Sequence, residues 1–115
     1  MSTQRILCVH DRAQELQELR GTLEQAGYEV VPAKDGSEAM HALRAGDVDG
    51  VVLDFNLEAP GGVTLRSRIS HAFPEMPLLL FSRVEEIKQM PLSVFEAYLH
   101  NPGPPESLIS RIPTN

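Results

Sequence analysis

Polar side chains follow the apolar runs of this sequence, at places where they could meet and do chemistry. They are His10 and Asp11 after the first run, Asp54 after the third, Ser82 after the fourth and Asn101 after the fifth. Two carboxylates brought close together repel each other unless one is protonated or a cation lies between them. A hard ion such as Mg²⁺ suits Asp11 and Asp54, since it commonly binds one or two carboxylates and keeps several waters. Ser82 and Asn101 then offer a hydroxyl and an amide to an anion bound beside that metal.

A purely structural role for the two acids stays open. Asp11 is also placed to cap a helix, and Asp54 to end a strand. The sequence has no glycine-rich phosphate loop, no metal-binding cysteine pair and no convincing serine–histidine–acid arrangement. The acids alone therefore do not decide between a metal site and a structural role.

The spacing of apolar residues predicts strands and helices in alternation. Strands are expected at 6–9, 28–33, 48–53, 78–81 and 97–100, and helices over 16–26, 35–45, 65–73, 84–87 and 108–112. A capping-box pattern at 35–38 opens the second helix, and Pro91 stops the fourth after about two turns.

Five strands with intervening helices predict an α/β fold, a doubly wound parallel sheet covered by helices on both faces. Pro32 places the second strand at a sheet edge, because proline has no N–H to donate to a neighbouring strand. In such sheets, sites form beyond the carboxyl ends of the strands. The polar residues named above stand at those ends.

Length and charge exclude several classes of protein. The 115 residues fit one domain. The formal net charge of −6 and the scattered cations argue against binding nucleic acid or an anionic membrane. The lone Cys8 cannot form an internal disulfide, which fits a reducing, cytoplasmic compartment. No apolar run approaches the roughly 18 residues that cross a bilayer, and the first residues lack the apolar core of a secretory signal.

Six segments, in order, resemble those of a response-regulator receiver domain, and the resemblance runs from Arg5 to about Ile112. The segments are ILCVHD at 6–11, GYEV at 27–30, AKDGSEA at 33–39, VVLD at 51–54, LLFS at 79–82 and YLHNP at 98–102. The resemblance implies a flavodoxin-like sheet of strand order 2-1-3-4-5. This order agrees with the edge position that Pro32 predicts for the second strand.

The resemblance also implies roles for individual residues. Asp54 is then the phosphoacceptor, Ser82 the phosphate-sensing hydroxyl and Tyr98 the switch aromatic. Mg²⁺ is held by Asp11, Asp54 and the backbone carbonyl of Asn56.

The sequence departs from the family pattern at several of these positions. His10 replaces the first acid of the family's acidic pair, and Asn101 replaces its near-invariant lysine. Arg83 stands where the family prefers a small residue that leaves the phosphoacceptor open. The interval from Ser82 to Asn101 is shorter than usual, which predicts a shortened fourth helix.

The changes at His10 and Asn101 offset each other in charge. The usual pocket has three carboxylates and one ammonium (−3 + 1 = −2), and Asp11 and Asp54 with neutral His10 and Asn101 also give −2. We therefore expect Mg²⁺ still to bind, with His10 beside the metal. Direct ligation of a softer metal by His10 is the alternative. A protonated His10 reduces the pocket charge to −1, so metal affinity is expected to fall below about pH 6.5.

Two functions remain open. The first is a single-domain receiver, residues 1–115 with no output domain, in two-component phosphorelay signalling. It accepts a phosphoryl group on Asp54 from a histidine kinase or phosphotransfer protein, with Mg²⁺, and signals to a downstream protein target. Its enzymatic activity is at most this self-phosphorylation and self-dephosphorylation. The second is a degenerate pseudo-receiver that a partner protein recognises without phosphate. Asp11, Asp54 and Ser82 favour the first function, whereas the departures favour the second.

Overall fold

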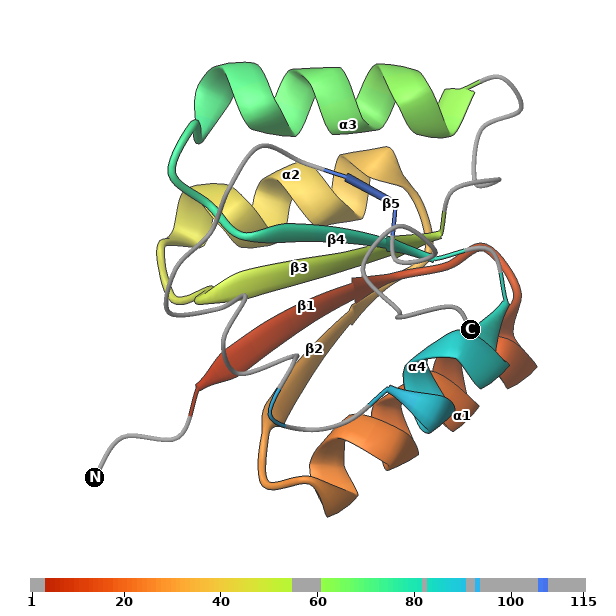
Figure 1. Ribbon diagram of the computed structural model, residues 1–115. Helices are drawn as coiled ribbons and strands as arrows, with labels where there is room; N and C mark the ends of the chain where they lie inside the picture. The colour runs from red at the N-terminus through yellow and green to blue at the C-terminus, as the bar shows by residue number, and fades with distance from the viewer. Residues whose placement is uncertain (1–3, 55–60, 82, 91–92, 94–105, 108–115) are drawn as a thin grey trace.

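A parallel β-sheet lies between two layers of helices (Figure 1). This computed structural model describes residues 4–54, 61–81, 83–90, 93 and 106–107. The strands are β1 (Arg5–Val9), β2 (Glu29–Ala33), β3 (Gly50–Asp54), β4 (Leu78–Phe81) and the two-residue β5 (Glu106–Ser107). The helices are α1 (Ala13–Gln25), α2 (Gly36–Ala45), α3 (Gly61–Ala72) and α4 (Val84–Gln89).

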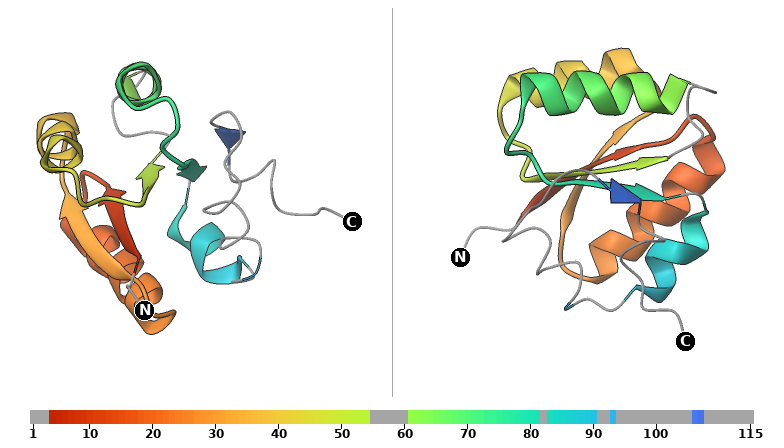
Figure 2. Two further views of the ribbon diagram at one scale, coloured as in Figure 1. Left: turned by 90° about the vertical axis from the view of Figure 1, so that its left-hand side faces the viewer. Right: turned by 45° about the horizontal axis from the view of Figure 1, so that its top comes forward.

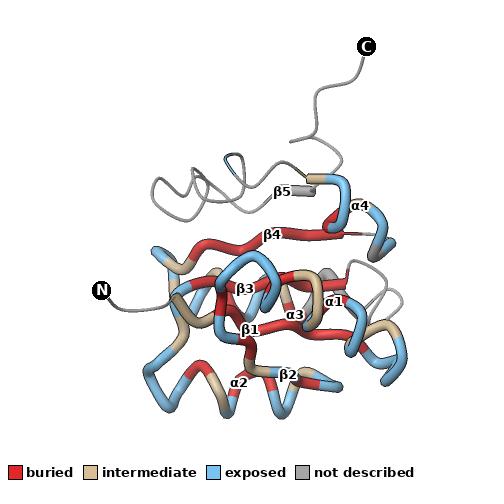
Figure 3. Tube along the Cα trace, turned by 90° about the horizontal axis from the view of Figure 1, so that it is seen from below, coloured by how far each residue is buried: buried red, intermediate tan, exposed pale blue. Residues whose placement is uncertain are grey.

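The strands lie side by side in the order β2-β1-β3-β4, with β5 next to β4. Pro32 lies in β2 at the edge of the sheet, opposite Cys8 of β1, which confirms the edge position that proline predicts. Strands β1, β3 and β4 are buried along almost their whole length, whereas exposed and buried residues mix along β2 (Figure 3). Continuous burial follows from helices covering both faces of a parallel sheet.

Four strands of the predicted five-stranded sheet are present in the predicted order. The fifth strand, predicted at 97–100, and the last helix, predicted at 108–112, lie outside the described residues. Strand β5 instead pairs Glu106 with Leu79 and Ser107 with Leu80, both in parallel. The prediction missed this pairing because two residues carry no periodicity that a sequence could show.

Successive side chains of a strand point to opposite faces of the sheet, and each face has its own apolar core. Ile6 and Cys8 of β1 pack with residues of α1 and α4, whereas Leu7 and Val9 pack with residues of α2 and α3. Figure 2 shows these two helix pairs on opposite sides of the sheet. The two cores hold β1 in the middle of the molecule and so fix the position of the residues that follow it.

Local signals in the sequence set the helix ends. The carboxylate of Asp35 accepts a hydrogen bond from the backbone N–H of Glu38 at 2.9 Å, which caps α2 as the capping-box pattern predicts. Gly27 and Gly46 follow α1 and α2 with φ angles of 99° and 93°, a left-handed conformation that glycine adopts without steric cost.

Helix α4 has six residues, as short as the sequence predicts. It begins where the backbone N–H of Arg83 donates to the carboxylate of Glu86 at 3.1 Å. The buried Ile87 joins the core shared with α1, and Lys88 pairs with Glu18 of α1 at 3.4 Å. Among the described residues, no helix is long and apolar enough to cross a membrane.

Candidate functional site

The carboxyl ends of β1 and β3 bring three of the predicted site residues together. His10 and Asp11 follow β1 directly, and Asp54 is the last residue of β3. One donor atom from each of the three side chains lies within 4.8 Å of the others, an arrangement that could hold a metal ion. The other predicted site residues, Asn56, Ser82, Tyr98 and Asn101, lie outside the described residues.

The backbone of His10 continues the pairing of β1 with β2. Its N–H donates to the carbonyl of Ala33 at 3.1 Å, so the residue is held at the end of the strand. Its imidazole packs against the ring of Phe81 at the end of β4, with the ring centroids 5.9 Å apart. His10 is 3% exposed and Phe81 is fully buried. The imidazole is therefore part of the interior of the molecule.

The hydrogen bonds of His10 determine which nitrogen carries its proton. The backbone N–H of Arg12 donates to Nδ1 at 3.1 Å, so Nδ1 offers a lone pair. Nε2 lies 2.7 Å from a carboxylate oxygen of Glu15 and is the nitrogen that donates. Since an imidazolium would need protons on both nitrogens, this arrangement assigns the neutral, Nε2-protonated tautomer to His10.

Three carboxylates surround this neutral ring. Besides Glu15, the Asp11 carboxylate lies 3.4 Å from Nδ1, and the Asp54 carboxylate lies 3.8 Å from Nε2. Asp54 is 5% exposed, and Asp11 is exposed at the rim. With the ring neutral, the three acids and the Arg12 guanidinium, which lies 3.2 Å from the Glu15 carboxylate, give a formal charge of −3 + 1 = −2. The demand for a cation therefore equals the −2 expected from Asp11 and Asp54 alone.

Glu15 is the site residue that the sequence alone did not reveal. Desolvation would raise its pKa, but the hydrogen bonds that its carboxylate accepts from Arg12 and from Nε2 of His10 outweigh it, so the pKa of Glu15 lies below its ordinary value. Nothing in the polar stretch around Glu15 distinguishes it from its neighbours. The one available signal is its place in the first turn of α1, which begins just after β1.

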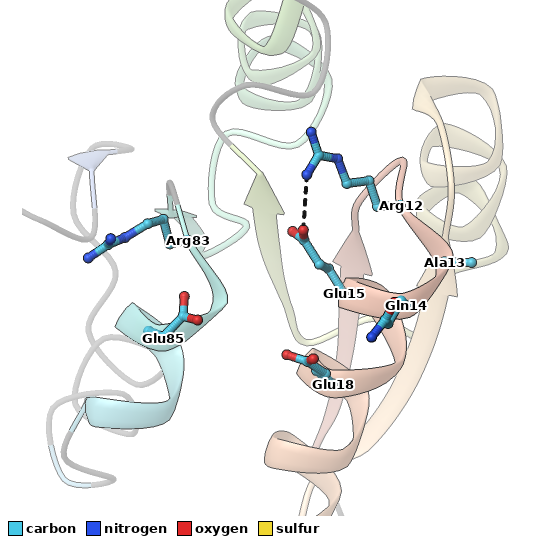
Figure 4. A pocket seen from close by; sticks show the side chains of 7 residues that line it. All are labelled: Arg12, Ala13, Gln14, Glu15, Glu18, Arg83 and Glu85. Carbon is cyan, nitrogen blue, oxygen red and sulfur yellow. Dashed lines mark hydrogen bonds and ion pairs between the residues drawn. The ribbon is translucent and has the colours of Figure 1, made fainter.

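A groove of about 720 Å³ opens between α1 and the start of α4 and borders the site at Glu15 (Figure 4). Its walls carry charges of both signs, from Arg12, Glu15 and Glu18 on one side and Arg83 and Glu85 on the other. Figure 4 shows the Arg83 side chain extending away from Glu15. Arg83 is exposed.

Comparison with known proteins shows the family to which this chain belongs. The sequence profile of the response regulator receiver domain matches residues 6–112. The chain belongs to this family. Receiver domains of this kind act in two-component signalling, so the chain is a receiver domain of a two-component system.

Relatives of this receiver domain are longer proteins. The chain is 32% identical over 114 residues to protein-glutamate methylesterase/protein-glutamine glutaminase 3 of Rhodospirillum rubrum. The aligned region covers 94% of this chain and 31% of that protein. The chain is also 26% identical over 111 residues to the alkaline phosphatase synthesis transcriptional regulatory protein PhoP of Bacillus subtilis. That alignment covers 94% of this chain and 46% of PhoP. The chain thus spans less than half the length of these relatives.

Solved structures show the same fold. The response regulator protein TrrA of Thermotoga maritima, in complex with Mg²⁺–BeF, matches with a TM-score of 0.64 and 28% identity over 69% of each chain. The chemotaxis response regulator CheY4 of Vibrio cholerae matches with a TM-score of 0.63 and 27% identity, over 70% of this chain and 68% of that one. The parallel α/β architecture is therefore the flavodoxin-like receiver fold.

Proposed function

We propose that residues 1–115 act as a single receiver domain that accepts a phosphoryl group on Asp54 from the phosphohistidine of a partner kinase or phosphotransfer protein. The observation that carries the proposal is the placement of Asp54. Its carboxylate is nearly buried at the end of the central strand β3, beside Asp11 and His10, in a chain that belongs to the receiver family.

The reaction needs little from the protein beyond position and charge. A carboxylate oxygen of Asp54 attacks phosphorus, and the new O–P bond forms as the P–N bond of the phosphohistidine breaks. The departing imidazole nitrogen keeps the electron pair of that bond and takes up a proton. The protein side of this transfer is self-phosphorylation. In self-dephosphorylation, water attacks the acyl phosphate, inorganic phosphate leaves and the Asp54 carboxylate is regenerated.

A divalent cation such as Mg²⁺ fits the carboxylates present. Asp11 and Asp54 are the oxygen ligands that Mg²⁺ prefers, and the family pattern adds the backbone carbonyl of Asn56. When bound, the ion supplies neutralisation of the negative charge on the phosphoryl group. Ser82 and Asn101 are proposed to donate hydrogen bonds to the phosphoryl oxygens, with Tyr98 as the switch aromatic.

The replacement of the family's lysine by Asn101 weakens the expected response. A hydrogen bond from a charged group contributes about 1.5–3 kcal/mol, and moving a two-state switch from almost fully off to almost fully on takes about 5.5 kcal/mol. A neutral amide recovers only part of that contribution. We therefore propose that phosphorylation shifts the conformational equilibrium of this receiver less than it does in members that keep the lysine.

The output is proposed to be a changed contact with a downstream protein. The formal net charge of −6 does not suit binding to nucleic acid or to an anionic membrane. The buried free thiol of Cys8 suits a reducing compartment, which supports a cytoplasmic location.

A pseudo-receiver is the second candidate function, and one observation favours it. The Asp54 side chain is 7% exposed, and the buried imidazole of His10, held by Glu15, lies 3.8 Å from its carboxylate. If the His10 imidazole keeps this position over Asp54, a phosphodonor does not reach the Asp54 carboxylate. A partner would then recognise the receiver in one fixed conformation.

Intact mass separates the two functions. The wild type is incubated with Mg²⁺ and a small phosphodonor such as acetyl phosphate, together with Asp54→Asn and the matched control Asp47→Asn, whose carboxylate is exposed and lies just before β3. We expect the wild type and Asp47→Asn to gain the mass of one phosphate, and Asp54→Asn to gain none. No gain in the wild type under any condition would support the pseudo-receiver instead.

A further inference from the structure

The lone pair on Nδ1 of His10 is a feature of the pocket that phosphoryl transfer does not use. Nδ1 carries no proton, because it accepts a hydrogen bond from the Arg12 backbone. It also lies 3.4 Å from the carboxylate of Asp11. An unprotonated imidazole nitrogen is a ligand for first-row transition ions and is a poor one for Mg²⁺, which prefers oxygen.

The other ring nitrogen already has the partner that metal-binding histidines commonly have. Nε2 donates to Glu15 at 2.7 Å, and an imidazole that binds a metal through one nitrogen usually donates its other N–H to a carboxylate or carbonyl. Such a contact orients the ring and increases its basicity. The His10–Glu15 pair is therefore prearranged for a metal at Nδ1, and no proton has to move between the ring nitrogens.

The spacing of the donor atoms also fits one ion. Bonds of about 2.0–2.2 Å to nitrogen and carboxylate oxygen place two ligand atoms of one zinc ion roughly 3–3.6 Å apart. The 3.4 Å between Nδ1 and the Asp11 oxygen falls in this range. The Asp54 carboxylate lies 3.8 Å from Nε2 of the same ring, and one donor atom from each of the three residues lies within 4.8 Å of the others. The Arg12 N–H that the metal displaces belongs to an exposed residue, so water can replace the lost hydrogen bond.

The carboxylates around His10 supply negative charge for a dication. Among the described residues, the Arg12 guanidinium contacts Glu15 at 3.2 Å and offsets the charge of that carboxylate. That pairing supports Glu15 as the carboxylate that positions the ring. Asp11 and Asp54 are the carboxylates that lie with His10 in the three-residue group.

We propose that this pocket binds a first-row transition ion such as Mn²⁺, Co²⁺ or Zn²⁺ in preference to Mg²⁺, through His10 Nδ1 and the carboxylates of Asp11 and Asp54, with Glu15 as a positioning residue. The proposal rests on the divalent-ion site of the proposed function but not on phosphoryl transfer.

The test is calorimetric titration of the full chain with Zn²⁺ and, separately, with Mg²⁺. Because most sites bind Zn²⁺ more tightly than Mg²⁺, the deciding quantity is the ratio of the two dissociation constants in each variant. His10→Asp restores the acid that the family usually has at this position. Glu15→Gln keeps the shape of the positioning side chain but removes its charge. His41→Gln, at an exposed position on α2, controls for zinc binding by surface histidines.

We expect one Zn²⁺ per chain and a preference for Zn²⁺ over Mg²⁺ at least about tenfold larger in the wild type and in His41→Gln than in His10→Asp. Glu15→Gln is expected to weaken Zn²⁺ binding about tenfold and to change Mg²⁺ binding little. In ¹⁵N NMR spectra of the imidazoles, saturating Zn²⁺ should shift Nδ1 of His10 and leave Nε2 protonated. Thermal unfolding without metal checks that each variant is folded.

An unchanged preference in His10→Asp, or unshifted ¹⁵N signals of His10, would overturn the inference. If Mg²⁺ still bound in that case, the divalent-ion site of the proposed function would stand. If the wild type bound neither ion, both the inference and that ion site would be wrong. The mass measurement on Asp54 would then test phosphorylation separately.

Discussion

At the end of β1, an imidazole stands where the receiver family usually has a carboxylate, and this exchange reorganises the pocket. His10 is buried, accepts a hydrogen bond from Arg12 and donates one to Glu15. The sequence was sufficient to predict that His10, Asp11 and Asp54 meet, because residues after parallel strands gather at one edge of the sheet. It was not sufficient to predict Glu15, since that contact depends on how α1 turns away from the strand.

The thiol of Cys8 provides a prediction at the scale of one residue. Cys8 is fully buried in the core between β1, α1 and α4, and burial raises the pKa of its thiol. The thiolate is the reactive form, so we expect no labelling by Ellman's reagent at pH 8 while the protein is folded. In a denaturant series, the fraction labelled should follow the fraction unfolded measured by circular dichroism. Fast labelling of the folded protein would contradict the buried position of Cys8.

At the scale of helices and strands, the structure follows from local signals. The apolar runs became β1, β3 and β4, Pro32 set β2 at the edge, and the cap at Asp35 began α2. These elements could be predicted because each carries a periodic pattern or a cap. The pairing of β5 with β4 could not, since two residues show no period and the partner is distant in sequence.

Alanine substitutions at two glycines are expected to change the free energy of unfolding in opposite directions, because the backbone conformations of the two residues differ. Gly21 lies inside α1, and a Cβ there would meet no atom within 4 Å, so Gly21→Ala should raise the free energy of unfolding by about 0.5–1 kcal/mol. Gly46 also has open space, but its φ of +93° is strained for alanine, so Gly46→Ala should lower it by about 1–2 kcal/mol. Urea denaturation measures both values. Effects of the same sign would contradict the account.

At the scale of the whole molecule, the receiver fold is the usual one, but the polar residues expected in its pocket differ from the family pattern. The family, the parallel sheet and the charge of −6 are consistent with a signalling domain that contacts other proteins. Asn101 is proposed to stand in place of the family's lysine, and the structure adds the carboxylate of Glu15 beside His10. Loss of the lysine is expected to lower the driving force for switching, while the Arg12–Glu15 pair keeps the formal charge of the pocket at −2. Ion binding is therefore expected to be stronger relative to switching in this receiver.

Ion binding should therefore stabilise the whole domain. A divalent ion at one hundred times its dissociation constant adds about 2.7 kcal/mol to the free energy of unfolding, if it binds only the folded chain. We expect EDTA to remove this gain in the wild type and in Asp47→Asn. In Asp54→Asn the gain should be smaller at the same ion concentration, because one ligand has lost its charge. Thermal or urea unfolding with and without the ion measures the effect, and an equal gain in all three proteins would place the ion elsewhere.

The most direct test of phosphoryl acceptance is chemical trapping at the residue itself. After treatment with a phosphodonor and a divalent ion, borohydride reduces an aspartyl phosphate to homoserine, and peptide mass spectrometry locates the change. We predict homoserine at position 54 and at no other aspartate. An unmodified Asp54, or homoserine at a different position, would contradict the assignment of Asp54 as the phosphoacceptor.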